Sequence, residues 1–344
     1  MLHVLVAPLL VSLFTNGALS DPGAGEPLPL KPIFDGKTLD GWVNYKTGKA
    51  PDNWGVEDGA LVRLGGGGDI MTAAQYDNFE LHLEWKIAAK GNSGIMYRVR
   101  SGDGAPYFSG PEYQVFDDAG HGLDAGSNVS AGALYGLVSP EGKSLKPTGE
   151  YNSARIVLQG DHLEHWLNGK KVLEIELDGE KWKGLVQGSK FKKWSQFGAS
   201  PIGHIDLQEH GSKVWYRNIR LRPLPPPKPT GMVHADLSPA SSHALLHQFA
   251  GSGELVVLDV RTQEEYDRGH LARVEHIDFY HKDFKHRLGG LDRDKTYLVY
   301  CKVGGRSGKA VGMMKELGFR VAYNMAGGWD RWSAEKRPTA KAVR

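Results

Sequence analysis

The stretch YLVYCKVGGRSGKAVGMMKELGF, residues 297–319, decides the fold of the C-terminal half. An apolar run ends at Cys301, the only cysteine of the 344-residue chain, and a helix-like pattern begins at Ser307. The same alternation occurs upstream, where the strand-like ELVVLDV (254–260) precedes the helix-like TQEEYDRG (262–269). Strands that alternate with helices indicate a parallel sheet, so we expect an α/β domain of roughly a hundred residues.

The loop that follows Cys301 has the composition of an anion-binding site. N–H groups at a helix N-terminus lack intrahelical partners, and the two glycines of the loop permit the positive φ angles that turn such groups inward. The loop also carries two cationic side chains, which together with the N–H groups favour a thiolate over an inert buried thiol. We predict a nucleophilic site with Cys301 and Arg306 as catalytic residues and with Lys302, Val303, Gly304, Gly305 and Ser307 in the anion-cradling loop.

Residues 232–337 resemble a single rhodanese domain. The resemblance rests on VVLDVRTQEEYDRGHL (256–271), CKVGGRS (301–307) and NMAGGWDRW (324–332). It implies that Cys301 carries a persulfide, that Arg306 closes the cradle, and that Asp259 and Arg261 have scaffold roles. It also implies a small sulfur donor and a thiophilic acceptor as partners. Four residues separate Cys301 from Arg306, which fits a sulfur-sized cradle, whereas the related phosphatase loops typically have five.

The domain departs from the rhodanese pattern in one place. The family usually has a Gly-Ala pair before its next strand, and this chain has Arg273-Val274. We expect the packing at this point to differ from that of the family.

A proline-rich segment divides the chain. RPLPPPKPTG (222–231) contains five prolines in ten positions, which favours an extended and semi-rigid linker, assigned to residues 223–231. Upstream of it, FELHLEWKI (79–87) alternates apolar and polar residues as a half-buried strand does, and Asn168-Gly169 is a strong hairpin signal. The N-terminal half is therefore predicted to be a β-sandwich.

Two strands of this half carry unusual polar side chains. Glu112 and Gln114 in PEYQVFDD are two residues apart and so share one face of a strand. In GHIDLQEHG (203–211) acidic, amide and histidine residues likewise alternate with apolar ones. A plain solvated face is the simpler explanation, but such a face usually carries lysines; we predict a sugar-binding groove. Its predicted sugar-binding residues are Arg98, Gln114, Asp117, His165, His204 and Gln208, although His165 may equally point into the core.

Residues 32–222 resemble the 3-keto-disaccharide hydrolase family, which has a concanavalin-like jelly-roll sandwich. The motifs include IFDGKTLDGWVNY (33–45), EYQVFDD (112–118) and GHIDLQEHG (203–211), and they occur in order along the domain. The resemblance implies a carbohydrate substrate, a 3-keto-glycoside. The alternative is a carbohydrate-binding module without catalysis, in which case only the rhodanese-like half is an enzyme.

Cleavage of such a sugar requires a base. A ketone at C3 makes the C2 proton acidic, so the group at C1 can leave once that proton is removed and the enolate is stabilised. Glu112 or a neutral histidine such as His210 can act as the base, with Arg98 or a cation as the electrophile. The residues suited to bind a divalent metal are Glu112, His204 and His210, but no tight ligand spacing such as H-E-x-x-H is present.

The rest of the sequence concerns location and partners. An apolar stretch, residues 4–14, is followed by Ala18-Leu19-Ser20, so we predict a signal peptide over residues 1–20 and export to the periplasm or the medium, with a short membrane anchor as the alternative. No later segment is apolar enough to span a bilayer. With 42 basic and 40 acidic residues and no basic tract, nucleic acid is not an expected partner. A single cysteine cannot form an internal disulfide.

Overall fold

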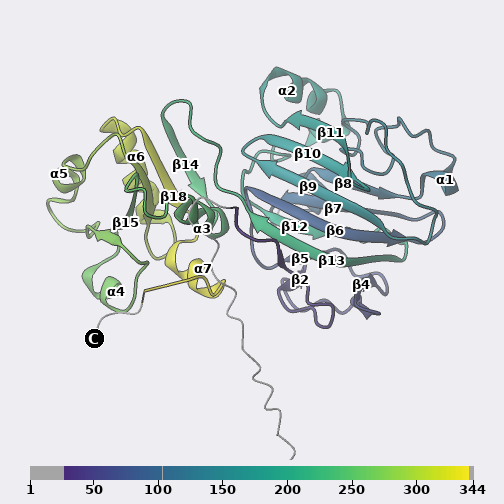
Figure 1. The fold of residues 1–344 in the computed structure, drawn as a ribbon, viewed down its shortest axis with the longest axis horizontal. Helices are drawn as coiled ribbons and strands as arrows, with labels where there is room; N and C mark the ends of the chain where they lie inside the picture. Colours follow the sequence, from purple (N-terminus) through teal and green to yellow (C-terminus); the bar gives the residue numbers. More distant parts are fainter. Residues whose placement is uncertain (1–26, 103, 341–344) are drawn as a thin grey trace, which may run out of the picture.

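The computed structural model describes residues 27–102 and 104–340, which form two domains of different architecture (Figure 1). The N-terminal domain is an antiparallel β-sandwich and the C-terminal domain is a parallel α/β sheet with helices, so the predicted fold class is confirmed. The predicted signal peptide lies outside the described residues, and export stays a prediction. Within the described ranges, no helix has the length and apolar character needed to cross a membrane.

The sandwich consists of an eight-stranded sheet and a five-stranded sheet. The larger sheet has the order β11-β10-β9-β6-β13-β4-β3, with β1 paired to β13, and the smaller has the order β2-β5-β12-β7-β8. The strands of the larger sheet are β1 (Lys31–Pro32), β3 (Trp54–Glu57), β4 (Ala60–Arg63), β6 (Phe79–Ile87), β9 (Asn152–Gln159), β10 (His162–Leu167), β11 (Lys170–Glu176) and β13 (Val214–Pro223). Those of the smaller sheet are β2 (Trp42–Asn44), β5 (Ile70–Thr72), β7 (Asn92–Val99), β8 (Glu112–Phe116) and β12 (His204–Leu207). Short helices in the connections are η1 (Pro106–Phe108), α1 (Asp118–His121), α2 (Gly179–Gln187) and η2 (Lys190–Lys193).

Alternation along the strands creates the core between the two sheets. In β6 the apolar residues are buried in the main core cluster, as the period of two predicts. The predicted hairpin joins β10 to β11, where Asn168 and Gly169 both have positive φ, 49° and 81°. The core therefore uses one face of each sheet and leaves the other face of the five-stranded sheet available for a site.

The C-terminal domain has a parallel sheet with the order β14-β18-β17-β15-β16. Its strands are β14 (Val233–Leu237), β15 (Leu255–Asp259), β16 (Val274–His276), β17 (Thr296–Tyr300) and β18 (Val321–Met325). Its helices are α3 (Pro239–Gln248), α4 (Gln263–Asp267), α5 (Phe284–Gly289), α6 (Gly305–Glu316) and α7 (Gly328–Ala334). Helix α6 begins at Gly305, two residues before the predicted start, because Gly304 supplies the left-handed cap with φ 91°.

The departure from the rhodanese pattern has a visible consequence. Arg273 adopts a left-handed φ of 52° directly before β16, a conformation that glycine adopts without a steric penalty. For a residue with a Cβ atom, such a conformation costs on the order of 1 kcal/mol, which the surrounding structure must offset.

A buried polar contact joins the two domains. Asp77, from the segment that precedes β6, is 3% exposed and accepts hydrogen bonds from the Ser238 amide (3.1 Å), from the Ser238 hydroxyl (2.6 Å) and from Ser241. Ser238 is also the N-cap of α3, accepting from the Ser241 amide. A carboxylate of the sandwich therefore stabilises the N-terminus of a helix in the other domain.

One further side-chain contact joins the two domains, and another joins the sandwich to the linker. Arg331 of α7 donates to the Gln75 side-chain oxygen over 2.6 Å, and the amide nitrogen of Gln75 lies 3.0 Å from Nε2 of His204. The proline-rich linker packs on the sandwich, since the Gln159 side chain donates to the Pro225 carbonyl over 3.0 Å.

Replacing Asp77 by alanine is expected to destabilise the domain junction by about 2 kcal/mol, because buried hydroxyl and amide donors lose their acceptor. The readout is the midpoint of urea-induced unfolding of the full chain. Asp178→Ala is the matched control, because Asp178 occupies the N-cap position of α2 without a side-chain hydrogen bond. Equal midpoints for the two variants would contradict the role assigned to Asp77.

Candidate functional site

Cys301 follows β17 and lies at the base of the loop that leads into α6. Its side chain is 1% exposed, so the thiol is recessed. The Gly304 amide lies 3.1 Å from Sγ, and the Ser307 hydroxyl donates to the same sulfur over 3.3 Å. The predicted inward turn of the loop is therefore present, and Gly304 provides it with its positive φ.

The loop favours the thiolate form of Cys301. Burial alone would raise the pKa of the thiol, but hydrogen bonds from the Ser307 hydroxyl and from the amides of Ser307, Val303 and Gly304 outweigh it, and the pKa lies below its ordinary value. A thiolate in a water-poor loop lined by N–H donors is suited to attack a sulfur atom and to hold a terminal persulfide.

Arg306 is held by an acidic residue of a neighbouring helix. Its guanidinium forms a bidentate ion pair with Glu265 of α4, with N–O distances of 2.7 and 2.8 Å. The hydrogen bonds from Arg306 lower the pKa of Glu265 to about 2. The charge of Cys301 also acts on the Arg306 guanidinium, which Glu265 holds in place, while the loop amides surround the sulfur. A role for Arg306 in closing the cradle stays a prediction. Glu265 also completes the capping box with Thr262 at the start of α4.

The turn before α7 is hydrogen-bonded to the backbone of the cysteine loop. The amides of Trp329 and Asp330 donate to the carbonyls of Cys301 and Lys302 over 2.8 and 3.0 Å. A Cβ atom on Gly328 would lie 2.3 Å from the Cys301 carbonyl oxygen, so only glycine fits there. The motif NMAGGWDRW thus supports the loop.

Asp259 and Arg261 form a buried pair, as their predicted scaffold role requires. The Arg261 Nη2 atom lies 2.7 Å from the Asp259 carboxylate and also donates to the Gly269 carbonyl. The guanidinium lies 4.5 Å from the centre of the Trp329 ring. This pair therefore connects β15 to the turn that supports the cysteine loop.

The surface beside the thiol carries two exposed apolar side chains. Val303 is 63% exposed and Tyr280 is 70% exposed, and the Tyr280 ring lies 5.6 Å from the Arg306 guanidinium.

In the sandwich, the strand register brings Glu112 and Asp206 onto one face, with Met96 between them. Glu112 of β8 pairs with Met96 of β7, and Met96 pairs with Asp206 of β12, so the three side chains project on the same side of the five-stranded sheet. Gln114 lies on this side as well, two residues from Glu112. The residues between them, such as Tyr113, face the core, so the polar group lies on the opposite, outer face.

Glu112 has the environment of a general base. It is 5% exposed, and burial raises its pKa to about 8, with a smaller opposing effect from the positive charge of Lys190. Its carboxylate lies against Gly94 of β7, where a Cβ atom would come within 2.2 Å of Oε1. Glycine at this position therefore makes room for the carboxylate.

Two carboxyl groups near Glu112 were not among the predicted site residues. Asp206 is fully buried, and neither of its oxygens accepts a hydrogen bond from an N–H or hydroxyl group of the described residues. Burial, and then the neighbouring charge of Asp69, raise its pKa well above the ordinary value. Burial also raises the pKa of Asp69 to about 6. The alternation in GHIDLQEHG includes Asp206, but no sequence pattern predicts that Asp69 lies beside it.

An amide network extends this face toward His210. The Gln114 side chain donates to Asn92 Oδ1 over 3.1 Å, and the amide nitrogen of Asn92 lies 3.3 Å from Nδ1 of His210. Gln208 lies next to these residues, with its backbone amide bound to the Gly94 carbonyl. His210 is exposed, so it is accessible to a ligand but is not desolvated as Glu112 is.

His165 is not a sugar-binding residue. Its ring is fully buried between Tyr97, whose hydroxyl lies 3.0 Å from Nε2, and the Gly132 carbonyl, 3.1 Å from Nδ1. Burial lowers its pKa to about 3, so the ring is neutral. Residue 165 lies on the same face of its strand as the core residues Leu163 and Leu167, so its side chain points into the core. The predicted sugar-binding role is therefore corrected.

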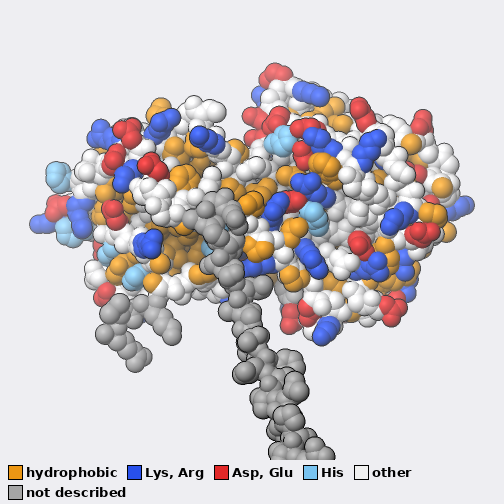
Figure 2. Space-filling model, viewed as in Figure 1, with side chains coloured by type: hydrophobic (Ala, Val, Ile, Leu, Met, Phe, Trp, Pro, Cys, Tyr) orange, Lys and Arg blue, Asp and Glu red, His pale blue; other side chains and the backbone are white. Residues whose placement is uncertain are grey.

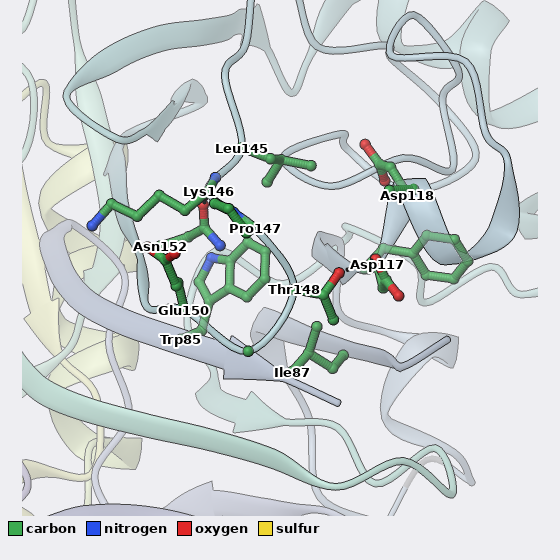
Figure 3. Close-up of a pocket in the computed structure, with 13 residues that line it drawn as sticks. Trp85, Ile87, Asp117, Asp118, Leu145, Lys146, Pro147, Thr148, Glu150 and Asn152 are labelled. Carbon is green, nitrogen blue, oxygen red and sulfur yellow. Dashed lines mark hydrogen bonds between the residues drawn. The ribbon is translucent and has the colours of Figure 1, made fainter. Parts of the chain in front are cut away.

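Arg98 and Asp117 are held by hydrogen bonds within the sandwich. Arg98 points toward the turn between β9 and β10, where it donates to the Gly160 carbonyl over 2.5 Å and lies 3.3 Å from Asp161. Asp117 caps α1 and accepts from the Lys90 amide and from the Thr148 hydroxyl, each over 2.7 Å. It lines a cavity of about 260 Å³ at the end of the sandwich (Figure 3). A sugar-binding role for Arg98 and Asp117 stays a prediction.

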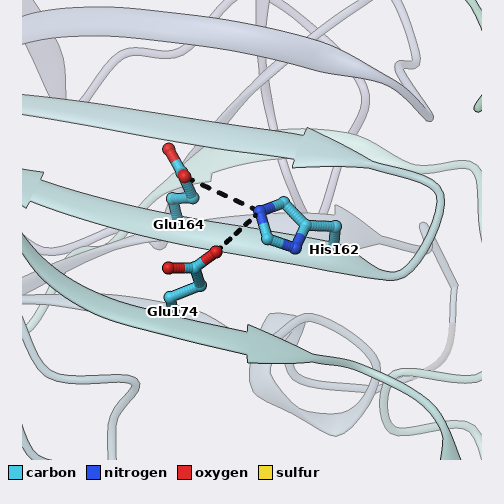
Figure 4. Close-up of side chains that lie close together, drawn as sticks. All are labelled: His162, Glu164 and Glu174. Carbon is cyan, nitrogen blue, oxygen red and sulfur yellow. Dashed lines mark ion pairs between the residues drawn. The ribbon is translucent and has the colours of Figure 1, made fainter.

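The predicted metal ligands do not converge. His204 bonds to the Thr72 carbonyl over 2.7 Å and to Gln75 at the domain junction, whereas His210 lies in an exposed loop. In the described part of the chain, the group with metal-like spacing is instead His162, Glu164 and Glu174 on the outer face of the larger sheet (Figure 4). Lys171 lies 3.1 Å from Glu164 and also contacts Glu174, so we assign this group as a surface ion-pair network.

Charged side chains are mixed on the surface of both domains. In the face shown in Figure 2, lysines and arginines alternate with acidic residues and form no continuous area of one sign. This surface offers no extended basic area for a nucleic-acid backbone on that face.

These features define a fusion of an antiparallel β-sandwich with a polar outer face and an α/β domain with an activated cysteine loop. The chain belongs to the family of 3-keto-alpha-glucoside-1,2-lyase-like domains through residues 29–222, and residues 242–335 match the rhodanese-like domain.

Relatives are known for each half. A 3-keto-disaccharide hydrolase of Bacteroides thetaiotaomicron is 36% identical over 224 residues, covering 56% of this chain and 77% of that protein. The thiosulfate sulfurtransferase GlpE of Coxiella burnetii is 30% identical over 101 residues, covering 29% of this chain and 92% of that protein. The crystal structure of a proposed glycosyl hydrolase from Parabacteroides distasonis matches with a TM-score of 0.53 and 36% identity, covering 57% of this chain and 94% of that one.

Proposed function

We propose that the chain is a bifunctional enzyme: the sandwich cleaves 3-keto-glycosides and the rhodanese-like domain transfers sulfane sulfur. The observation that carries the first activity is the buried Glu112, with its pKa of about 8, on the same sheet face as Asp206, whose pKa burial raises well above the ordinary value. The likeness to a 3-keto-disaccharide hydrolase supports the substrate class. The second activity is supported by the lowered pKa of Cys301 inside a loop of N–H donors.

In the sandwich, ionised Glu112 takes the C2 proton of the oxidised sugar. The electron pair of the C2–H bond forms an enolate with the C3 carbonyl, and it then forms the C1–C2 double bond as the C1–O bond breaks. The aglycone leaves with a proton, and addition of water to the double bond completes hydrolysis. We assign the hydrogen bond to the enolate oxygen, the role predicted for Arg98, to Asp206, because burial and the charge of Asp69 raise its pKa and favour its protonated form. None of these steps requires a bound metal ion.

In the rhodanese-like domain, the Cys301 thiolate attacks the outer sulfur of a donor such as thiosulfate. The donor S–S bond breaks, sulfite leaves with the electron pair, and Cys301 carries a persulfide. The amides of Val303 and Gly304 and the Ser307 hydroxyl stabilise the terminal negative charge as they stabilise the thiolate. A nucleophilic acceptor then takes the outer sulfur and the thiolate is restored.

Turnover of a 3-keto-disaccharide by the full chain is expected to rise with pH up to about 8. Glu112 must be ionised to act as a base, and its pKa is raised to about 8. The value of kcat/KM should therefore increase roughly tenfold per pH unit below the pKa and level off above it. The measurement is product formation against pH by chromatography.

The matched substrate is the same disaccharide without the ketone, which should not react because its C2 proton is not acidic. A parallel series with chelator tests for a metal. Full activity at pH 5, far below the raised pKa, would exclude Glu112 as the base. No turnover of the keto sugar at any pH would favour the carbohydrate-binding module.

A further inference from the structure

A cluster of aromatic side chains surrounds Lys190 near one end of β8. The Lys190 ammonium lies 4.4 Å from the ring centre of Tyr135 and 5.7 Å from that of Tyr107. Trp194 lies 5.5 Å from the Tyr107 ring, measured between centroids. We call Tyr107, Tyr135, Trp194 and Lys190 the aromatic platform.

The platform has a packed layer beneath it and an accessible layer above. Phe191 is 2% exposed and stacks on Phe197 at 4.1 Å, which anchors η2 to the core. Tyr107, in contrast, is 36% exposed, Lys190 is exposed, and Trp194 is half-buried. Phe108 stacks on one face of Trp194, with ring centroids 4.4 Å apart, so only part of the Trp194 ring is accessible, whereas Tyr107 and Lys190 are exposed.

Backbone contacts fix the platform beside Glu112. The Tyr135 amide donates to the Glu112 carbonyl over 3.0 Å, so this ring belongs to the segment directly next to the proposed base. Ser109, between η1 and β8, accepts from the Gly198 amide over 2.8 Å, which ties the Tyr107 segment to the Trp194 segment. The charge of Lys190 also acts on the Glu112 carboxyl. The platform is therefore part of the surroundings of Glu112, although it does not hydrogen-bond to the carboxylate.

We propose that the aromatic platform binds the second sugar ring of a disaccharide, the ring that leaves, while the oxidised ring lies at Glu112. This inference rests on the proposed function of the sandwich. A pyranose ring has an apolar C–H face that packs on an aromatic ring, and its hydroxyl groups accept hydrogen bonds from an ammonium group. Tyr107 and Trp194 supply the rings, and Lys190 supplies the donor. The platform thus gives a preference for disaccharides over glycosides with a small aglycone.

The test compares two substrates with the full chain: a 3-keto-disaccharide and methyl 3-keto-glucoside, which has no second ring. In Trp194→Ala the KM for the disaccharide should rise at least tenfold with kcat little changed, because the ring binds but takes no part in proton transfer. The kcat/KM for the methyl glycoside should stay within about twofold of wild type. Lys190→Met should act in the same direction on the disaccharide and should also raise the pH midpoint of activity, since a positive charge near Glu112 is lost.

Trp215→Ala is the matched control. Trp215 also pairs with a lysine, Lys86 at 4.3 Å, but it lies on the other sheet, and its loss should change neither substrate. Equal losses for both substrates in Trp194→Ala, or equal effects of Trp194→Ala and Trp215→Ala, would overturn the proposal. A circular dichroism spectrum and an unfolding midpoint show that each variant is folded, and Trp194→Phe, which keeps a ring, should recover most of the affinity.

Failure of the proposed catalysis is distinguishable from failure of the platform. If wild type does not turn over the keto sugar, calorimetric titration with the unoxidised disaccharide replaces the kinetic assay. Binding that is lost in Trp194→Ala and kept in Trp215→Ala then supports the platform in a binding module. Binding that is absent in wild type, or equal in both variants, refutes it.

Discussion

Cys301→Ser is expected to abolish sulfur transfer completely. A serine hydroxyl at this position is not ionised near neutral pH and cannot form a persulfide, and the chain has no second cysteine to replace it. After incubation with thiosulfate, mass spectrometry of wild type should show one added sulfur atom that cyanide removes, and the variant should show none.

The same variant should keep full activity on the 3-keto-disaccharide, because Cys301 and Glu112 belong to different domains and sheets. Sulfur uptake by Cys301→Ser would place the reaction elsewhere. If fresh, reduced wild type takes up no sulfur from any donor, and its thiol titrates near the unperturbed value of about 8.5, the domain is a rhodanese in fold alone.

Glu112→Gln is expected to reduce cleavage of the 3-keto-disaccharide by about 10² to 10⁴-fold in kcat, the usual contribution of a general base. Glutamine has nearly the same shape, so it fits against Gly94 and the fold should persist. Only the ability to take the C2 proton is lost, and KM should change little. The measurement is the steady-state rate above pH 8, where wild-type Glu112 is mostly ionised.

Sulfur uptake at Cys301 serves as the internal control, since Glu112→Gln should not affect it. A loss below about tenfold would remove Glu112 from the mechanism, because general acid–base groups contribute more than that. In that case Asp69, whose pKa of about 6 makes it a better base below neutral pH, is the next candidate to replace.

The local patterns of the sequence were sufficient to predict the architecture of both domains. A period of two in residues 79–87 and the Asn168-Gly169 turn predicted strands and a hairpin, because side-chain alternation and turn geometry depend on neighbouring residues alone. The cysteine loop was predictable for the same reason: strand, glycines and helix start are contiguous, so the N–H groups that face Sγ belong to the loop itself. The same parity argument places His165 with the core leucines.

The partners of the site residues depend on the tertiary structure. Glu265 pairs with Arg306, 41 positions away, and Asp69 lies beside Asp206, because separate elements pack side by side. The raised pKa of Glu112 likewise comes from burial in the folded sandwich, and the charge of Lys190, distant in sequence, partly opposes it. The sequence by itself determined the two folds, the cysteine loop and the polar strand face, since each is set by local periodicity. Only the tertiary structure decided which of these polar groups are buried, which form ion pairs, and which have shifted pKa values. The physical reason is that desolvation and charge interactions act through space and not along the chain.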